Sequence, residues 1–60
     1  MEEIQLTKGE AYINLELVSA IYWTDRKAFD AGWWIAGLNF DLQLKDSNEA
    51  RRVRDLISKL

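Results

Sequence analysis

The sequence contains no cysteine, no histidine and no proline among its 60 residues. Without cysteine there are no disulfides, and without cysteine or histidine a structural zinc site of the usual kind cannot form. The commonest general base and the thiolate nucleophile are also missing. The sequence therefore predicts neither a metal nor a cofactor.

Other signatures of common functions are missing as well. Gly9, Gly32 and Gly37 stand alone, so there is no glycine-rich phosphate loop. Glycosidases use two carboxylates for acid–base catalysis, and Asp25 and Asp30 could in principle form such a pair. That mechanism needs an enclosed cleft, which a chain of 60 residues can hardly form. We interpret these aspartates as turn residues and expect no enzymatic activity.

Long apolar runs and an excess of one charge are absent too. No run approaches the roughly 20 apolar residues of a membrane-spanning helix, and the start lacks the basic and then apolar pattern of a secretion signal. The 8 basic and 10 acidic residues give a net charge of −2, which disfavours nucleic acid and anionic lipid as partners. We expect a cytoplasmic protein that contacts no membrane.

What the sequence does contain is apolar and aromatic. Hydrophobic residues make up 48% of the chain, and seven of them are aromatic. A chain this short forms one domain, residues 1–60, and buries too little surface to be more than marginally stable alone. Dense packing and self-association are the two means of stabilisation that the composition leaves open.

The residue pattern predicts strands first and a helix last. Residues 4–6, 11–14 and 19–24 alternate or are rich in β-branched and aromatic side chains, as strands are. Residues 14–18 favour a single helical turn capped by Asn14, with Leu17 and Val18 turned inward. A charged segment, residues 25–32, separates these strands from the next one and is longer than most hairpin loops.

Residues 33–45 alternate with period two, which predicts a strand with one buried face. Gly37 marks either a bulge in one long strand or a tight turn that divides the segment into a hairpin. The face that the alternation makes apolar comprises Trp34, Ala36, Leu38, Phe40, Leu42 and Leu44.

The C-terminal residues predict a helix. Asp46 is a suitable N-cap, and Glu49 is placed to complete a capping box. An apolar stripe at helical spacing contains Ala50, Val53, Leu56, Ile57 and Leu60. The fold class that follows is α+β: an antiparallel meander of three or four strands with the C-terminal helix packed on one face.

Adjacent aromatic residues in the strands suggest a binding surface. Neighbours in a strand point to opposite faces, so one of Tyr22 and Trp23, and one of Trp33 and Trp34, must point away from the helix. Exposed aromatic patches commonly mark interaction sites. The alternative is that the segment around Phe29 folds back and covers them.

The candidate ligand-binding or partner-binding residues gather around residues 25–32. They are Trp23, Arg26, Lys27, Trp33 and Trp34. Aromatic faces with basic groups can hold a nucleotide or another planar anion, and copies of this group could enclose a pocket at a subunit interface. The alternative is that the tryptophans are core or interface residues and the two basic side chains are solvated.

The first half and the helix junction resemble a known family. The residues are Ile4-Gln5-Leu6-Thr7, Gly9, Tyr12-Ile13-Asn14, Leu17 and Ile21, followed later by Leu44-Lys45-Asp46-Ser47-Asn48-Glu49. In these the chain is similar to the small flagellar FlbD-type proteins. The resemblance implies a short, cytoplasmic, strand-rich protein that ends in a helix, and no function is transferred from it.

The sequence thus favours a non-catalytic, homo-oligomeric protein-interaction module of an accessory or inhibitor type, such as phages encode. It would contact another copy, and then a protein partner, through an aromatic sheet face and the Trp-rich loop. The first alternative is capture of a small nucleotide or other planar anion at the subunit interface. A nucleic-acid binder using Arg51, Arg52 and Arg54 is the weakest hypothesis because the overall charge is acidic.

Overall fold

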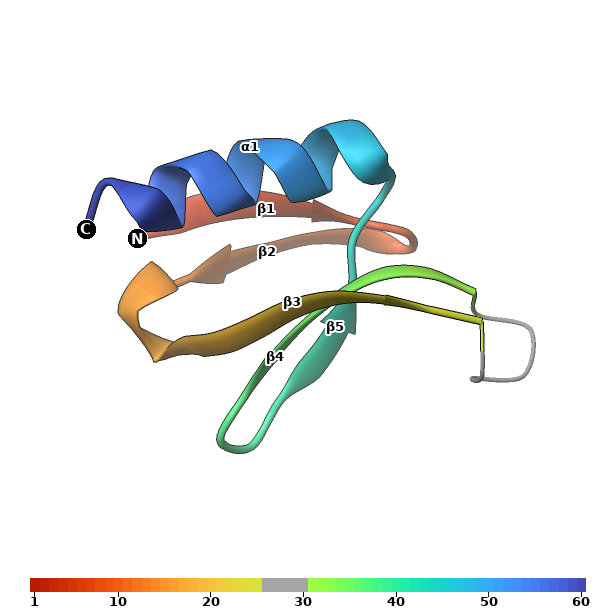
Figure 1. Ribbon diagram of the computed structural model, residues 1–60, viewed down its shortest axis with the longest axis horizontal. Helices are drawn as coiled ribbons and strands as arrows, with labels where there is room; N and C mark the ends of the chain where they lie inside the picture. Colours follow the sequence, from red (N-terminus) through yellow and green to blue (C-terminus); the bar gives the residue numbers. More distant parts are fainter. Residues whose placement is uncertain (26–30) are drawn as a thin grey trace.

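The computed structural model describes residues 1–25 and 31–60. They form two small antiparallel sheets, and helix α1 contacts β1 of one sheet and β4 of the other (Figure 1). The α+β class and the antiparallel meander with a C-terminal helix packed against it are confirmed. In chain order the elements are β1 (Glu2–Leu6), β2 (Gly9–Ile13), the 3-10 turn η1 (Leu15–Leu17), β3 (Val18–Thr24), β4 (Gly32–Gly37), β5 (Asp41–Gln43) and α1 (Ser47–Ser58).

The first sheet is the β1–β2 hairpin. Ile4 pairs with Ala11, and Leu6 pairs with Gly9 at the turn. Gly9 has a φ of 143°, in the region that favours glycine, because a side chain there would be strained. Ile4 is completely buried, so this hairpin contributes one of the largest enclosed side chains of the core.

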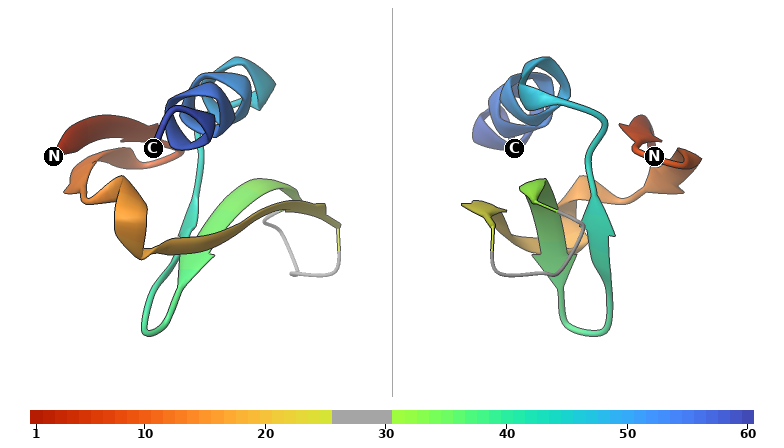
Figure 2. Two further views of the ribbon diagram at one scale, coloured as in Figure 1. Left: turned by 60° about the vertical axis from the view of Figure 1, so that its left-hand side comes forward. Right: turned by 90° about the vertical axis from the view of Figure 1, so that its right-hand side faces the viewer.

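The second sheet has the order β3-β4-β5, and backbone contacts link it to the first sheet where β1 and β5 end. A bridge links Leu6 to Leu44, and the Thr7 amide donates to the Gln43 carbonyl at 3.1 Å. The Lys45 amide donates to the Gln5 carbonyl at 3.0 Å. Figure 2 shows the helix on one side of both sheets and the β4–β5 turn pointing away from it. When the Leu6–Leu44 bridge is counted as the link between the sheets, the described strands follow the order β2-β1-β5-β4-β3, with β2 and β3 outermost.

Residues 33–45 form two strands, and the sheets therefore contain five. β4 ends at Gly37 and β5 begins at Asp41, so the hairpin alternative is the one observed. An ideal Cβ at Gly37 would collide with the Phe40 ring and would lie 2.7 Å from the Leu17 carbonyl oxygen. Only glycine leaves room for this close turn.

The turn changes the phase of the alternation, which corrects the predicted apolar face. Ile35 lies opposite Leu42, and it is Ile35 that is completely buried. Leu38, which was placed on the apolar face, is almost wholly exposed at the tip of the turn. Period-two alternation assigns side chains to the correct face only within one uninterrupted strand.

The turn at residues 14–18 forms as expected, but with a different residue inside. The Asn14 side chain accepts a hydrogen bond from the Glu16 amide at 3.1 Å, which confirms the cap. Leu15 is buried, whereas Leu17 is 61% exposed. The prediction that Leu17 turns inward is wrong because the tight 3-10 turn directs its first residue to the core.

The core lies between the sheets and one face of α1. Its buried apolar residues come from both hairpins, η1 and the helix: Ile4, Ile13, Leu15, Ile35, Leu44, Ala50 and Val53. Leu56 and Ile57 extend the predicted helix stripe as partly buried residues, whereas Leu60 lies beyond the helix and is exposed. No helix in residues 1–25 and 31–60 is long and apolar enough to cross a membrane.

Candidate functional site

Strand β3 is the edge of the sheet most suited to an interaction. Its sequence, VSAIYWT, holds no charged residue and no proline. Natural edge strands are commonly protected from further pairing by lysine, proline or a marked bulge. β3 carries one irregularity, between Val18 and Ala20 at its start, and its remaining residues pair regularly with β4. A regular, uncharged edge of this kind is suited to pairing with another chain.

Two of the predicted site residues lie together at the far end of this strand. Trp23 is opposite Trp33 in the β3–β4 register, and side chains of opposite residues share a face. Trp33 packs against the core, whereas Trp23 is 55% exposed. The Trp23–Trp33 pair therefore extends from the core to the surface, where more than half of the Trp23 side chain is exposed to solvent.

The third tryptophan lies on the other face of the sheet. Trp34 follows Trp33 in β4 and is opposite Tyr22, so these two point away from the helix side. Trp34 borders a separate hollow together with Lys8 and Gln43. The three tryptophans thus occupy two faces of the sheet, and the predicted residues Arg26 and Lys27 lie outside the described residues.

A groove separates β3 from α1. It consists of two hollows of about 240 and 260 Å³ that share Ile21 and Arg54. The first is bordered by four consecutive β3 residues, 18–21, and by Ile57 of the helix. Val18 and Ile21 both pack against the core, so this part of the groove adjoins the core-facing side of β3.

The rim of the groove is basic. Arg51 and Arg54 line it from the helix, and the described residues that line it include no acidic one. In the described part of the chain Arg51 makes no ion pair, and Arg54 pairs only with its neighbour Asp55 at 3.8 Å, where both side chains are more than 60% exposed. Such an exposed pair contributes little, so both guanidinium groups remain open to an anion.

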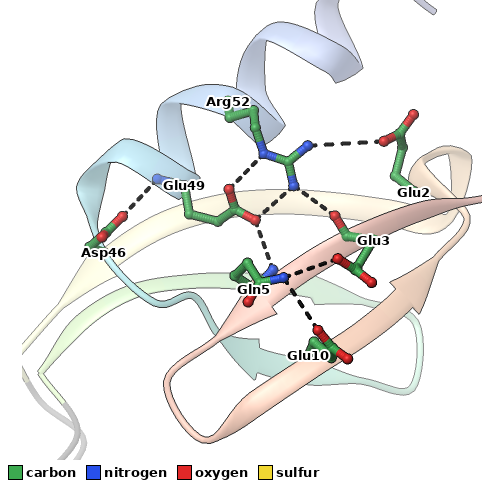
Figure 3. A network of polar contacts seen from close by, with 7 residues as sticks. All are labelled: Glu2, Glu3, Gln5, Glu10, Asp46, Glu49 and Arg52. Carbon is green, nitrogen blue, oxygen red and sulfur yellow. Dashed lines mark hydrogen bonds and ion pairs between the residues drawn. The ribbon is translucent and has the colours of Figure 1, made fainter.

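Arg52 differs from these two because it is held inside the fold. It donates to the Glu49 carboxylate from Nε at 2.6 Å and from a terminal nitrogen at 2.7 Å, and that same nitrogen donates to the Glu3 carbonyl (Figure 3). The Glu2 carboxylate lies 4.0 Å from the other terminal nitrogen of Arg52. Of the three helix arginines, Arg52 is therefore the one with a structural role.

Glu49 is the buried charged residue of the described chain, at 7% exposed. Besides Arg52, the Gln5 amide donates to its carboxylate at 2.7 Å (Figure 3). The Arg52 hydrogen bond lowers the pKa of Glu49, the Gln5 amide adds to this, and burial opposes both. A carboxylate held ionised by these donors is suited to fastening the helix to β1 and is a poor general acid.

This arrangement corrects half of the predicted capping box. Asp46 caps the helix, since its carboxylate accepts from the Glu49 amide at 2.9 Å. The Glu49 carboxylate was expected to return to Asp46, but it binds Gln5 and Arg52 instead. The Arg52 guanidinium and the Gln5 amide are better donors to the Glu49 carboxylate than the Asp46 amide would be. Both lie in the partly buried interface between α1 and β1, and the bond from Arg52 is charge-assisted.

No group of three or more aspartates or glutamates among the described residues is placed to hold a metal ion. Every buried side-chain polar atom in residues 1–25 and 31–60 has a hydrogen-bond partner. The Trp23–Trp33 pair and the basic groove are the described surface features to which a ligand or partner could bind.

Sequence reasoning did not assign the groove, although the helix spacing contained a signal. Arg51 and Arg54 are three positions apart, so they lie on the same side of the helix. Ala50 and Ile57 adjoin them in the apolar stripe. That spacing places two cations at the margin of the packed face, but only the tertiary structure shows that the first half of β3 lies beside them.

Comparisons with models of known protein families, with curated proteins and with solved structures found no match.

Proposed function

We propose that this protein is a non-catalytic, homo-oligomeric protein-interaction module that self-associates through the aromatic end of its β3–β4 hairpin. The observation that carries the proposal is Trp23, more than half exposed beside Trp33 on an uncharged edge strand. The module then presents its remaining surface to a protein partner, as an accessory or inhibitor protein does.

The energetics of Trp23 support association. A tryptophan side chain buries about 150–250 Å² when covered, so the exposed part of Trp23 corresponds to roughly 100 Å². At about 25 cal/mol per Å², covering it contributes about 2.5 kcal/mol per copy. For a 60-residue domain that is a large fraction of a total stability of about 3–9 kcal/mol.

Further apolar side chains surround the opposite end of β3. Leu17 is exposed just before the strand, and Leu38 is exposed in the turn next to Gly37. The Leu17 backbone approaches Gly37 closely, so the two leucines belong to one region. Apolar side chains that gather on a small surface favour association over solvation.

Sedimentation velocity at several protein concentrations tests self-association. We expect the parent chain to form an oligomer that Trp23→Ser converts to a monomer with an unchanged circular dichroism spectrum. Tyr12→Ser is the control, because Tyr12 is also an exposed aromatic residue, at 66% against 55% for Trp23, and lies on β2. A parent that stays monomeric at all concentrations, or a Trp23→Ser variant that associates like the parent, contradicts the proposal.

A second candidate is capture of a nucleotide or other planar anion, and one observation favours it. Trp33 lines the same hollow as Arg51 and Arg54, near the first helical residue Ser47. An aromatic ring beside two guanidinium groups provides both stacking and charge for such a ligand. The candidate differs from the original prediction in using these helix arginines in addition to the residues around position 26.

A further inference from the structure

The second hollow of the groove, beside the first turns of α1, combines an aromatic ring with two basic side chains. Its volume is about 260 Å³, and its lining residues come from β3, β4 and α1: Ile21, Trp33, Ser47, Ala50, Arg51 and Arg54. Ligand pockets are lined mainly by apolar and aromatic side chains, with a few polar groups that fix the orientation of the ligand. This hollow has that composition, because it combines apolar residues and a tryptophan with two guanidinium groups and one hydroxyl.

The aromatic wall of the hollow is fixed by the fold. Trp33 and Ile21 are partly buried and pack against the core. The Trp33 carbonyl accepts a hydrogen bond from the Leu44 amide at 2.8 Å, and Trp33 is paired with Trp23 in the β3–β4 register. A side chain held in this way loses little freedom when a ligand binds. Trp33 is therefore suited to stack against a planar ring.

The charge of the two basic side chains is available to a ligand. Arg51 and Arg54 are three positions apart and so lie on the same side of α1. Asp55 pairs with Arg54 at 3.8 Å and in solvent, where such a pair contributes little. The described lining of the hollow contains no acidic residue, and the Asp46 carboxylate at the start of the helix accepts a helix amide. An anion in the hollow would therefore meet two guanidinium groups and no opposing carboxylate in its lining.

This pair of guanidinium groups favours a phosphate group over a carboxylate. A phosphate monoester carries a charge of about −1.5 to −2 at neutral pH, which two guanidinium groups balance. A single carboxylate would leave one of them without a counter-charge. The planar guanidinium group also binds phosphate oxygens through paired hydrogen bonds.

The size of the hollow limits the ligand to one ring system and one phosphate. Ligand pockets commonly measure about 300–1,000 Å³, and this hollow is slightly smaller than that range. Arg54 is the one basic residue among the described lining residues of the adjoining hollow. Additional phosphates that extended there would gain no further basic partner, so a triphosphate has no advantage over a monophosphate.

We propose that this hollow binds a nucleoside monophosphate, whose base stacks on Trp33 and whose phosphate is held by Arg51 and Arg54. The inference rests on the second candidate function, anion capture, and narrows it in two respects. The ligand carries a single phosphate beside a single planar base, and the side chains that hold the phosphate belong to α1.

Ligand binding and the proposed self-association are tested separately. Self-association depends on Trp23 and is measured by sedimentation, whereas ligand binding depends on Arg51 and Arg54 and is measured by NMR titration. Either result can fail while the other holds.

The probe is adenosine 5′-monophosphate, added to the isotope-labelled protein while the indole and amide signals are followed. Adenosine and ribose 5-phosphate each lack one part of the probe, and phenyl phosphate has a ring and a phosphate but no nucleoside. The protein variant is Arg51→Gln with Arg54→Gln. Lys8→Gln with Lys59→Gln is the control, since it removes the same charge from two exposed residues that do not line the hollow. Trp33→Phe identifies the indole signal of Trp33.

We expect the monophosphate to shift the Trp33 indole signal and the amide signals around Arg51, in the parent and in the lysine control alike. The arginine double variant should keep the dispersed spectrum of the folded chain and bind the monophosphate about fivefold more weakly or worse. Adenosine, ribose 5-phosphate and phenyl phosphate should each bind more weakly than the monophosphate, and adenosine triphosphate no more tightly.

The proposal is overturned if the monophosphate shifts none of these signals, or if the arginine variant binds it as the lysine control does. Equal binding of adenosine or ribose 5-phosphate would exclude the joint use of ring and phosphate, and equal binding of phenyl phosphate would exclude the nucleoside. Binding that survives the loss of Arg51 and Arg54 but not Arg26→Ala would overturn this site while leaving anion capture intact.

Discussion

Replacement of Glu49 by alanine should destabilise the fold strongly, because Glu49 fastens α1 to β1. The change leaves the partly buried Gln5 amide without its acceptor, at a cost of about 1–3 kcal/mol. It also removes two charge-assisted bonds from Arg52, whose side chain is 43% exposed, so solvent screening reduces their contribution to about 0.5–1 kcal/mol. Alanine has a higher helix propensity than glutamate, so the substitution regains a small part of this loss, less than about 0.7 kcal/mol.

The expected loss is therefore about 1–4 kcal/mol of unfolding free energy. For a domain of this size each kcal/mol corresponds to about 4–8 °C, which predicts a fall in Tm of at least about 4 °C. Urea unfolding followed by circular dichroism measures it, with Asp55→Ala as the control because Asp55 is an exposed acid on the same helix. A Glu49→Ala variant that unfolds within about 0.5 kcal/mol of the control would refute the role assigned to this carboxylate.

The same residue predicts a dependence on pH. The folded state lowers the pKa of Glu49, so its contribution is complete above the unfolded pKa of about 4.3 and is lost as the pH falls through the folded value. The stability difference between the parent and Glu49→Gln should thus be constant near neutral pH and shrink below about pH 4. A difference that grows on acidification would contradict the direction of the shift.

Three further changes test other parts of the structure. Gly37→Ala should cost about 1–3 kcal/mol, read from urea unfolding, because the new methyl group meets the Phe40 ring; no loss would contradict the packing of the turn. Asp46→Ala should cost about 1 kcal/mol by the same measurement, since the Glu49 amide loses its cap; Asp46→Asn should recover most of it. If the second candidate function holds, a nucleotide panel should quench tryptophan fluorescence and Arg26→Ala should weaken that quenching; an unchanged signal across the panel would rule strongly against it.

The elements that depend on local chemistry were predictable from the sequence. Asp46 begins the helix and Asn14 caps the short turn, since each side chain accepts from an amide two or three residues later. Gly37 was recognisable as a point where the alternation of residues 33–45 could break. The predicted strands and the helix stripe follow from periodicity alone.

The relations between distant segments were not predictable. Glu49 binds Gln5, 44 positions away, and no local pattern distinguishes that bond from a capping box. The position of the hairpin turn decides that Ile35, and not Trp34, belongs to the core. The division of the tryptophans between two faces depends on the same register, and the resemblance to the FlbD-type proteins stays a prediction.

The bond between Gln5 and Glu49 also bears on the order in which the chain folds. The Gln5 amide belongs to β1, whereas the carboxylate that accepts from it and the arginine that supports that carboxylate belong to α1. Closing so long a loop costs entropy before the bond forms, which delays such contacts relative to the local hairpins. In refolding experiments the β1–β2 hairpin is therefore expected to form before α1 packs against it. Until α1 is in place the Gln5 amide lacks the Glu49 acceptor, so the packing of the helix completes the hydrogen bonding of β1.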